Sequence, residues 1–554
     1  MPTDRRRQLA SLVVVRGSGH CGDGQRRYPR WELTNGQLQS LLHQGVGGVI
    51  LLGGSAAELR LRTAQLQRWA DQPLLLCADV EEGVGQRFEG ASWLVPPLAL
   101  GRLYERSPQQ ATELAERYGR CSGRQARLVG LNWVLGPVCD VNNNPANPVI
   151  NVRAWGETPA ASAGLAAAFV RGCQAEGVLA CAKHFPGHGD TSSDSHLELP
   201  LLAHSRERLE AVELPPFRAA IAAGVASVMT AHLQLPALDP ERPATLSAAV
   251  LTDLLRSDLG FGGLVVTDAL VMEAITAHHG AAEAAVLAFE AGADLILMPA
   301  DAEAAIDGLE AALQEGRLTP ERLEASLERR RKALAHCSGA ASPSSADLTG
   351  ILDDLEQLIS PAELDLSRTL LNLSLQQHEA SPAPPPAATA MVTPSSRLPA
   401  GPGINLIRLD QQLNTPQLPA MAPALLRPAA LGYTATLLDG RSPTPWSDDP
   451  AAPLALDRLG EGPVLLQLFV RGNPFRGSAG GEEPWPAVIQ QLQAAGRLTG
   501  LAVYGSPYLW EQLLPLLQPS LPAAYSPGQM PQAQAVLLEQ LGLAAAALEG
   551  GFTD

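Results

Sequence analysis

The strongest constraint on the fold is a regular alternation of short apolar runs with longer helical segments. Eight apolar runs of strand length occur before residue 338: 11–15, 47–52, 73–79, 131–141, 178–185, 227–232, 263–268 and 293–299. Segments with helical periodicity lie between them, at 108–127, 159–176, 206–223 and 280–291. Strands that alternate with helices predict parallel βα units. Eight such units predict an α/β fold of the TIM-like (β/α)8 type, with an open doubly wound sheet as the competing arrangement.

Polar side chains and one methionine stand at the C-terminal ends of these runs. They are Asp79, Asp140, Lys183, His184, His232, Asp268 and Met298. In a (β/α)8 barrel these ends converge on one mouth, where sites are assembled from different strands. One such residue is readily explained as a helix cap, but a whole set of caps is a poor explanation. The pattern therefore predicts a functional site at the mouth.

The chain divides into three parts by composition. Residues 1–338 form the predicted barrel, and 339–403 form a connection with a helical stretch at 350–378 and a Pro/Ala-rich stretch. Residues 404–554 carry new apolar runs and predict a smaller C-terminal α/β domain. The runs in this last part are 404–409, 463–470 and 498–505.

Charge and composition exclude several classes of protein. Forty basic residues against 57 acidic ones give a net charge of −17, which disfavours nucleic-acid binding. The sequence contains no apolar stretch long enough to span a membrane, and the run at 9–15 fits a first strand better than a signal peptide. Seven scattered cysteines without metal-binding spacing predict reduced thiols. The expected location is therefore the cytoplasm.

The segment 183–200 is the densest in chemically active residues. It holds one of the two lysines of the chain, three of the eleven histidines and two aspartates, and its Gly and Ser content predicts a loop. One alternative is a zinc site with the ligands His184, His188, Asp190 and His196. A purely structural loop is another. A strand that ends in Lys183-His184 suggests instead two donors aimed at an oxygen-rich ligand such as a sugar.

Two carboxylates and a histidine suggest acid/base and nucleophilic chemistry. Asp194 is two residues from His196, a spacing at which the carboxylate can orient the ring and raise its basicity. Asp268 ends the strand GLVVTD, where it either caps the next helix or acts as a nucleophile. Together these residues match the pairing used in retaining glycoside hydrolysis.

Several ordered motifs carry a family resemblance. DVEEGVGQR (79–87), LGPVCDVNNNPANPVINVRAWGETP (135–159), KHFPGHG, DSH, GGLVVTDAL and AGADLILMP follow one another along the chain. They resemble glycoside hydrolase family 3, specifically its β-N-acetylhexosaminidase branch. SRTLLNLSL (367–375) is similar to the entry segment of a second family domain. Glu82 departs from the pattern, because the family has a glycine there, and its side chain puts the local turn in question.

The resemblance implies a role for each matching residue. Asp268 would be the nucleophile, and His196 the acid/base with Asp194 as its partner. The residues that would hold the sugar hydroxyls are Asp79, Arg87, Arg153, Lys183 and His184, with His232 and Met298 lining the mouth.

The implied activity is that of a retaining exo-β-N-acetylglucosaminidase without metal or cofactor. Its expected substrate is a GlcNAc-containing carbohydrate, such as a muropeptide from peptidoglycan recycling, and its expected state is a monomer or weak oligomer. The alternatives are a β-N-acetylglucosaminide phosphorylase, a β-glucosidase, and an inactive sugar-binding protein.

Overall fold

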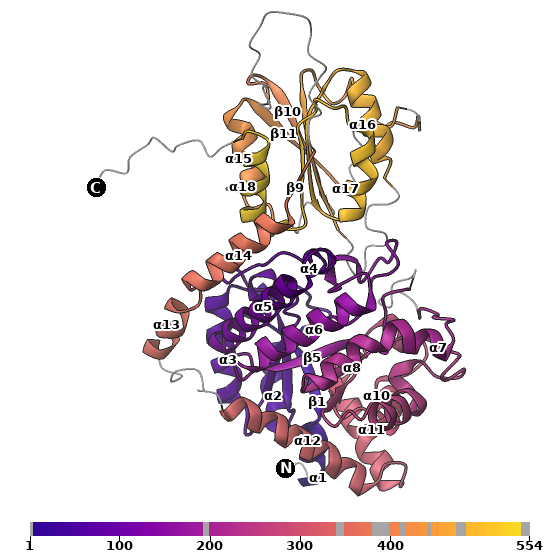
Figure 1. The fold of residues 1–554 in the computed structure, drawn as a ribbon. Helices are drawn as coiled ribbons and strands as arrows, with labels where there is room; N and C mark the ends of the chain where they lie inside the picture. Colours follow the sequence, from indigo (N-terminus) through magenta and orange to yellow (C-terminus); the bar gives the residue numbers. More distant parts are fainter. Residues whose placement is uncertain are drawn as a thin grey trace, which may run out of the picture. The chain divides into compact units, whose positions relative to one another are not determined.

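The computed structural model describes residues 4–191, 199–339, 348–378, 398–409, 416–439, 445–450, 452–471 and 483–543. The chain forms two compact units, Met1–Ser367 and Arg368–Asp554 (Figure 1). Each unit contains a predominantly parallel sheet and its own helices.

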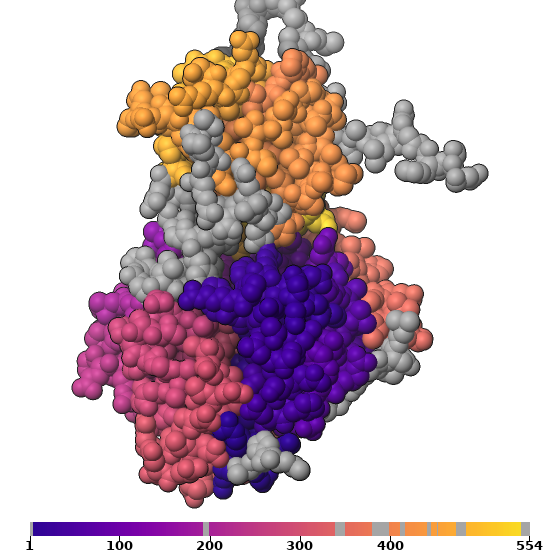
Figure 2. Space-filling model, turned by 180° about the vertical axis from the view of Figure 1, so that it is seen from behind, coloured from indigo at the N-terminus to yellow at the C-terminus, as the bar shows by residue number. Residues whose placement is uncertain are grey.

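The first unit is a barrel of eight parallel strands. The strands are β1 (Val13–Ser18), β2 (Gly48–Leu52), β3 (Leu75–Ala78), β4 (Trp133–Val134), β5 (Leu179–Phe185), β6 (Ser227–Thr230), β7 (Leu264–Val266) and β8 (Ile296–Leu297). They pair in sequence order from β1 to β7, and β8 pairs with β1. A parallel bridge between Val266 and Leu295 closes the ring. Figure 2 shows this closure from outside, since the indigo start of the chain lies directly beside the rose segment that ends the barrel.

Helices surround this barrel, as the sequence predicts. They are α1 (Asp4–Ala10), α2 (Asn35–Gln44), α3 (Ala56–Trp69), α4 (Leu98–Tyr104), α5 (Pro108–Leu128), α6 (Pro159–Gln174), α7 (Arg206–Arg208), α8 (Leu214–Ala222), α9 (Glu273–Thr276), α10 (Ala281–Ala291), α11 (Ala302–Gln314), α12 (Pro320–Gly339) and α13 (Leu348–Glu356). A further helical segment covers Ala249–Asp258. The local sequence explains where two of these helices begin. Thr34 forms a capping box with Gln37 at the start of α2, and Thr158 caps α6, whose first residue is Pro159.

Strand register shows which side chains face the interior of the barrel. Trp133 pairs with Cys77 on one side and with Leu179 on the other, and paired residues share a face. The Trp133 indole nitrogen donates to the hydroxyl of Ser227, 2.8 Å away on β6, across the interior. Because side chains alternate along a strand, Lys183 follows Leu179 on the inner face, at the C-terminal end of β5.

The second unit is a six-stranded sheet with the strand order β11-β10-β12-β13-β14-β9. All pairs are parallel except that of β9 with β14. The strands are β9 (Gln376–Gln377), β10 (Gly403–Arg408), β11 (Tyr433–Leu438), β12 (Val464–Val470), β13 (Leu498–Gly505) and β14 (Ala523–Ser526). The helices are α15 (Pro423–Ala430), α16 (Trp485–Ala494), α17 (Pro507–Leu513) and α18 (Pro531–Gln540), while α14 (Pro361–Ser374) spans the division between the units.

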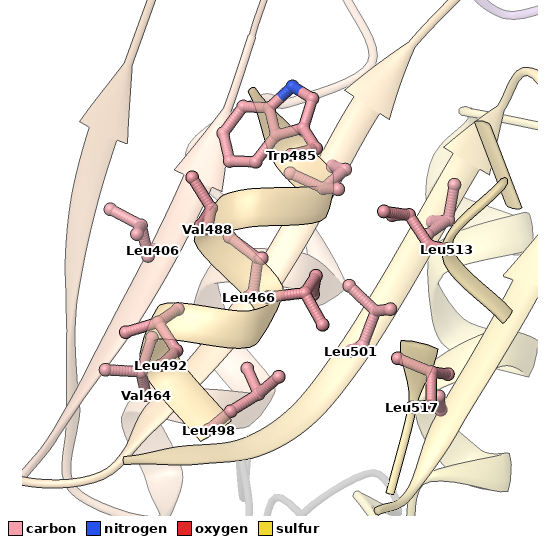
Figure 3. Packing of buried hydrophobic residues seen from close by; sticks show 14 of the residues in the cluster. Leu406, Val464, Leu466, Trp485, Val488, Leu492, Leu498, Leu501, Leu513 and Leu517 are labelled. Carbon is pink, nitrogen blue, oxygen red and sulfur yellow. The ribbon is translucent and has the colours of Figure 1, made fainter. Parts of the chain in front are cut away.

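The described residues of the second unit form two hydrophobic clusters, and one of them lies where α16 packs on the sheet. Trp485, Val488 and Leu492 of α16 are fully buried and face strand residues such as Leu466 and Leu501 (Figure 3). Apolar contact of this kind supplies the main free energy for holding a helix on a sheet.

The fold class predicted from the sequence is confirmed. Each of the eight predicted runs overlaps a barrel strand, and a second, smaller α/β domain follows. The predicted helical stretch 350–378 ends in the short strand β9, and β11 and β14 were not predicted. Within the described ranges, none of the helices combines the length and the apolar content that crossing a bilayer requires.

Candidate active site

A network of buried ion pairs forms one wall of the barrel mouth. The Lys183 ammonium lies 2.7 Å from Oδ1 of Asp79 and 2.7 Å from Oε1 of Glu81. The Arg153 guanidinium donates to both oxygens of Glu81, with Nε at 2.7 Å and Nη2 at 2.9 Å. Lys183 and Glu81 are almost completely buried, whereas 38% of the Asp79 side chain is exposed. Three of the residues predicted to bind sugar, Asp79, Arg153 and Lys183, therefore lie together.

Mutual pairing keeps all four groups charged. Burial alone would raise the pKa of Glu81, but the charges of Arg153 and Lys183 hold it well below its usual value. Burial would likewise raise the pKa of Asp79, but Lys183 and Arg87 lower it. Burial alone would lower the pKa of Lys183, but the two carboxylates raise it. The wall therefore carries two positive charges and two negative charges, which cancel.

Asp140 organises the backbone and ring of the residues that follow Lys183. Its carboxylate accepts from the backbone N–H groups of His184 and His188, at 3.2 Å and 2.7 Å, and lies 2.8 Å from Nδ1 of His184. Asp140 is fully buried. Burial alone would raise its pKa, but the interactions with His184 and His188 together lower it. His184 is one of the residues predicted to bind sugar. Its contact with Asp140 through Nδ1 fixes the direction in which the other ring nitrogen, Nε2, points.

The chain beyond His188 is held close to the barrel. A Cβ on Gly189 would come within 1.8 Å of the Val141 carbonyl oxygen, so only glycine fits there. Nδ2 of Asn147 donates to the carbonyls of His188 and Gly189, at 2.9 Å and 3.0 Å. These contacts anchor the N-terminal end of the loop predicted to carry the acid/base. Asp194 and His196 themselves lie outside the described residues.

Asp268 lies just beyond the end of β7 and is partly exposed. Its backbone N–H donates to Oγ1 of Thr230 at 3.2 Å, and Thr230 Oγ1 lies 2.8 Å from Oγ1 of Thr245. Thr245 Oγ1 lies 2.8 Å from Nδ1 of His232, and Nε2 of His232 donates to the Ala269 carbonyl at 3.1 Å. This chain of hydrogen bonds fixes the backbone on both sides of Asp268. His232 is fully buried, and its contact with the Ala269 carbonyl places it beside the segment that carries Asp268.

Asp268 and the ion-pair wall face the same part of the interior. Burial raises the pKa of the Cys181 thiol on β5 to about 12, and the negative charges of both Asp79 and Asp268 add to this rise. Met298, after β8, is 7% exposed, and its carbonyl accepts from the N–H of Val271 at 3.0 Å. Its φ of 46° is uncommon for a residue other than glycine. The contact with Val271 holds the segment that follows Asp268 against the end of β8.

The local turn that Glu82 puts in question is formed. Glu82 is buried, and its Oε2 accepts from the Trp93 indole nitrogen at 2.9 Å. The next residue, Gly83, supplies the positive φ of 78° that the turn requires. Arg87 reaches back to donate from Nε to the Asp79 carbonyl at 3.1 Å. The spacing of Asp79 and Arg87 therefore brings them together in spite of Glu82.

Two central residues were missed as site residues by sequence reasoning. Glu81 bridges Lys183 and Arg153, and Asp140 aligns His184. Asp140 was noticed as a polar strand end but received no role. Glu81 was detectable in principle, because it lies two residues after Asp79 in the same motif.

Three of the four ligands proposed for a zinc site contact other side chains, and the fourth, His196, lies outside the described residues. Nδ1 of His184 faces Asp140, Nδ1 of His188 lies 2.6 Å from Thr191 Oγ1, and Asp190 lies 2.7 Å from Nε2 of His204. Among the described residues, no group of three or more His, Cys, Asp or Glu side chains is placed to hold a metal ion.

Fold and site together define a two-domain protein in which a (β/α)8 barrel carries a polar, charge-paired mouth. A profile described as the Glycosyl hydrolase family 3 N terminal domain matches residues 6–332. A second, described as the Bacterial Glycosyl hydrolase family 3 C-terminal domain, matches residues 399–542. The chain therefore belongs to glycoside hydrolase family 3, as its motifs suggested.

Known proteins resemble the chain both in sequence and in structure. It is 37% identical over 365 residues to "Beta-hexosaminidase A" of Pseudoalteromonas piscicida, a match that spans 59% of the chain and 60% of that protein. It is 38% identical over 271 residues to "Beta-hexosaminidase" of Stenotrophomonas maltophilia, across 48% of the chain and 80% of that protein. In structure it resembles a family 3 β-N-acetylglucosaminidase from Paenibacillus, with a TM-score of 0.76 and 29% identity over 99% of the chain and 98% of the other.

Proposed function

We propose that the protein is a retaining exo-β-N-acetylglucosaminidase. The observation that carries this proposal is the position of Asp268, whose backbone is fixed on both sides at the mouth that also holds the Lys183–Glu81–Arg153 network. Names of relatives support the choice of sugar, since two are β-hexosaminidases and the structural neighbour is a β-N-acetylglucosaminidase.

The proposed reaction has two steps. The Asp268 carboxylate attacks the anomeric carbon while His196, oriented by Asp194, protonates the leaving oxygen. A glycosyl ester forms on Asp268. His196 then takes a proton from water, which attacks the same carbon and releases the sugar with retained configuration. No residue in this scheme requires a metal, so activity is expected to survive dialysis against EDTA.

The remaining mouth residues bind the terminal sugar. Asp79, Arg87, Arg153, Lys183 and His184 would hold its hydroxyls, and their hydrogen bonds accelerate the reaction only to the extent that they strengthen in the transition state. Natural substrates derived from peptidoglycan and a cytoplasmic location stay predictions.

The test compares 4-nitrophenyl β-N-acetylglucosaminide with the matching β-glucoside. We expect kcat/KM to be higher for the acetamido sugar. A higher kcat/KM for the glucoside would instead favour the β-glucosidase alternative. A relative from Cellulomonas fimi, 35% identical, is named for both activities, "Beta-N-acetylglucosaminidase/beta-glucosidase". A fluorinated sugar inactivator should label a peptide that contains Asp268, and Asp268→Asn should lose nearly all turnover. Labelling of another residue would refute the assignment. Product analysis with added phosphate separates hydrolysis from phosphorolysis.

A further inference from the structure

A buried tyrosine on α5 contacts the ion-pair wall from the helix layer of the barrel. Tyr118 is fully buried. Its hydroxyl donates to the carbonyl oxygen of Glu81, at 3.2 Å, and to that of Val95, at 2.9 Å. One proton shared between two carbonyls ties the start of the loop 81–95 to its end. The tyrosine therefore holds the backbone of the carboxylate that pairs with both cations of the wall.

The ring of the same tyrosine packs beside the other partner of this ion pair. Trp155 follows Arg153 by two residues, and its ring centroid lies 5.2 Å from that of Tyr118, edge to face at 76°. Phe169 of α6 packs against both rings, with its centroid 6.2 Å from that of Tyr118 and 5.5 Å from that of Trp155. Edge-to-face contacts between aromatic rings have a defined geometry. Tyr118 thus touches the segments of both Glu81 and Arg153, which are 72 residues apart in the chain.

Close backbone packing holds α5 against its neighbour α6 (Figure 1). A Cβ on Gly119 of α5 would come within 2.2 Å of the Phe169 carbonyl oxygen. A Cβ on Gly172 of α6 would come within 2.0 Å of the Glu116 carbonyl oxygen. Only glycine allows two helices to approach so closely. A helix packed in this way cannot shift without a clash, so the Tyr118 hydroxyl is held at a fixed point.

A second side chain on the same face of α5 holds the middle of the loop 81–95. Gln125 follows Tyr118 by seven residues, about two helical turns, and is also fully buried. Its Oε1 accepts from the Ser92 N–H at 3.0 Å, and its Nε2 donates to the Ser92 hydroxyl at 2.8 Å. The Ser92 carbonyl in turn accepts from the N–H of Gly85 at 2.9 Å. The loop is therefore attached to α5 at several points.

We propose that Tyr118 is a positioning residue that sets the distance between Glu81 and Arg153 in the ion-pair wall. The inference rests on the proposed function, because the exact geometry of the wall matters for activity only if the wall binds the sugar. Loss of the hydroxyl removes a donor from the Glu81 carbonyl and releases the loop from α5 at this point. The Glu81 carboxylate then reaches Lys183 and Arg153 with poorer geometry, although the ring still packs beside Arg153.

A double-mutant cycle on kcat/KM tests this role, with 4-nitrophenyl β-N-acetylglucosaminide as the substrate. Tyr118→Phe keeps the ring and removes only the hydroxyl, so we expect kcat/KM to fall by about tenfold, the effect of one lost buried hydrogen bond. Glu81→Gln alone should lower it by about a hundredfold. If Tyr118 acts through Glu81, the double variant should also lose about a hundredfold, and not about a thousandfold. The loss in Tyr118→Phe should fall on kcat more than on KM, because the wall is proposed to bind the transition state more tightly than the substrate.

Tyr433→Phe is the matched control. Tyr433 begins β11 in the second unit and is buried, and its hydroxyl donates to the Pro399 carbonyl at 3.0 Å. The substitution removes the same kind of hydrogen bond, from a buried tyrosine to a backbone carbonyl, in a different unit of the chain. The control should leave kcat and KM unchanged, both in the wild type and in the Glu81→Gln background.

The outcomes separate this inference from the proposed function. If the wild type does not hydrolyse the aryl N-acetylglucosaminide, the proposed function fails and the positioning role fails with it. If the wild type is active, but Tyr118→Phe matches it or its loss multiplies with that of Glu81→Gln, only the positioning role is wrong. Should circular dichroism show that Tyr118→Phe does not fold, Trp155→Phe decides in the same cycle, because it keeps a ring beside Arg153 but reduces the contact with Tyr118. Wild-type kcat/KM in Trp155→Phe, or losses that multiply, would then overturn the proposal.

Discussion

Replacing Glu81 by glutamine tests whether the ion-pair wall holds the sugar-binding cations in place. Glu81 accepts three short hydrogen bonds, one from Lys183 and two from Arg153. Only 2% of its side chain is exposed. Glutamine has almost the same shape, but it loses the charge and turns an N–H group toward one of these donors. The substitution therefore removes a buried counter-ion without opening a cavity.

The expected losses follow from the number of bonds. Breaking a buried ion pair costs about 3–5 kcal/mol of the free energy of unfolding, and each hydrogen bond to a charged group contributes about 1.5–3 kcal/mol. Because the glutamine keeps one acceptor oxygen and Lys183 keeps Asp79, we expect a loss of about 3 kcal/mol. If Lys183 and Arg153 bind the transition state, kcat/KM should fall by about a hundredfold, since about 1.4 kcal/mol corresponds to a factor of ten.

The effect should also depend on pH in a defined direction. The pKa of folded Glu81 lies well below its ordinary value of 4.5. Its contribution to stability is therefore complete above pH 4.5 and is lost as the pH falls through the folded pKa. The variant lacks this contribution at every pH. The difference in unfolding free energy between the wild type and Glu81→Gln should thus be largest near neutral pH and shrink in acid.

Asp354→Asn is the control for stability. Asp354 forms a buried ion pair with Arg60, at 3.0 Å, between α13 and α3 and away from the mouth. Unfolding in guanidinium chloride should show a comparable decrease in the free energy of unfolding for both variants. Only Glu81→Gln should have a lower kcat/KM on the aryl N-acetylglucosaminide. A Glu81→Gln enzyme whose kcat/KM stays within about threefold of the wild type would refute the reasoning, because its two cations would not depend on Glu81.

Three further predictions concern the nucleophile, the loop and the buried histidine. His196→Ala should lower kcat/KM by about 10²–10⁴-fold on a disaccharide and far less on an activated aryl glycoside. Asp194→Asn should act in the same direction but more weakly. Equal losses of kcat/KM on both substrates would contradict the acid/base role. Thr245→Val should lower kcat by about tenfold with little change in KM, because it breaks the hydrogen-bond chain that fixes the Asp268 backbone, and Thr245→Ser should restore it. Burial lowers the pKa of His188 from 6.5 to about 4. The free energy of unfolding of the wild type should therefore fall as the pH drops from 6.5 to 4, and the fall should be smaller in His188→Gln, which lacks this titrating group.

Strand and helix periodicity was sufficient to predict the barrel. Each short apolar run is flanked by helical segments, and eight such units have few ways to close. The convergence of strand ends predicted that Asp79 and Lys183, 104 residues apart, would lie at the same barrel mouth. The ion pair that they form there, at 2.7 Å, was not predicted.

Pairing within the mouth was harder to predict. Glu81 meets an arginine 72 residues later in the chain, and nothing local marks it as the acceptor in preference to Glu82 beside it. Both are buried, but Glu82 turns to the indole of Trp93. Which of two adjacent carboxylates faces the site depends on the turn at Gly83, whose conformation is not encoded in hydrophobic pattern.

The second domain shows a different limit. Only the first and last residues of strand β11 are buried, and its sequence YTATLL lacks a clear apolar alternation. Strand β14 is four residues long, and β9 only two. Strands this short exist because a neighbour supplies their hydrogen-bond partners, as β13 does for β14 and β14 does for the edge strand β9. Such dependence on a partner leaves little signal in the strand's own sequence.

Charge balance within the ion-pair wall explains how it can hold an uncharged sugar beside the Asp268 carboxylate. On the wall, two cations, Lys183 and Arg153, are matched by two carboxylates, Asp79 and Glu81. A balanced set of donors and acceptors suits a neutral sugar, and it also means that these cations do not need the Asp268 carboxylate as their counter-ion.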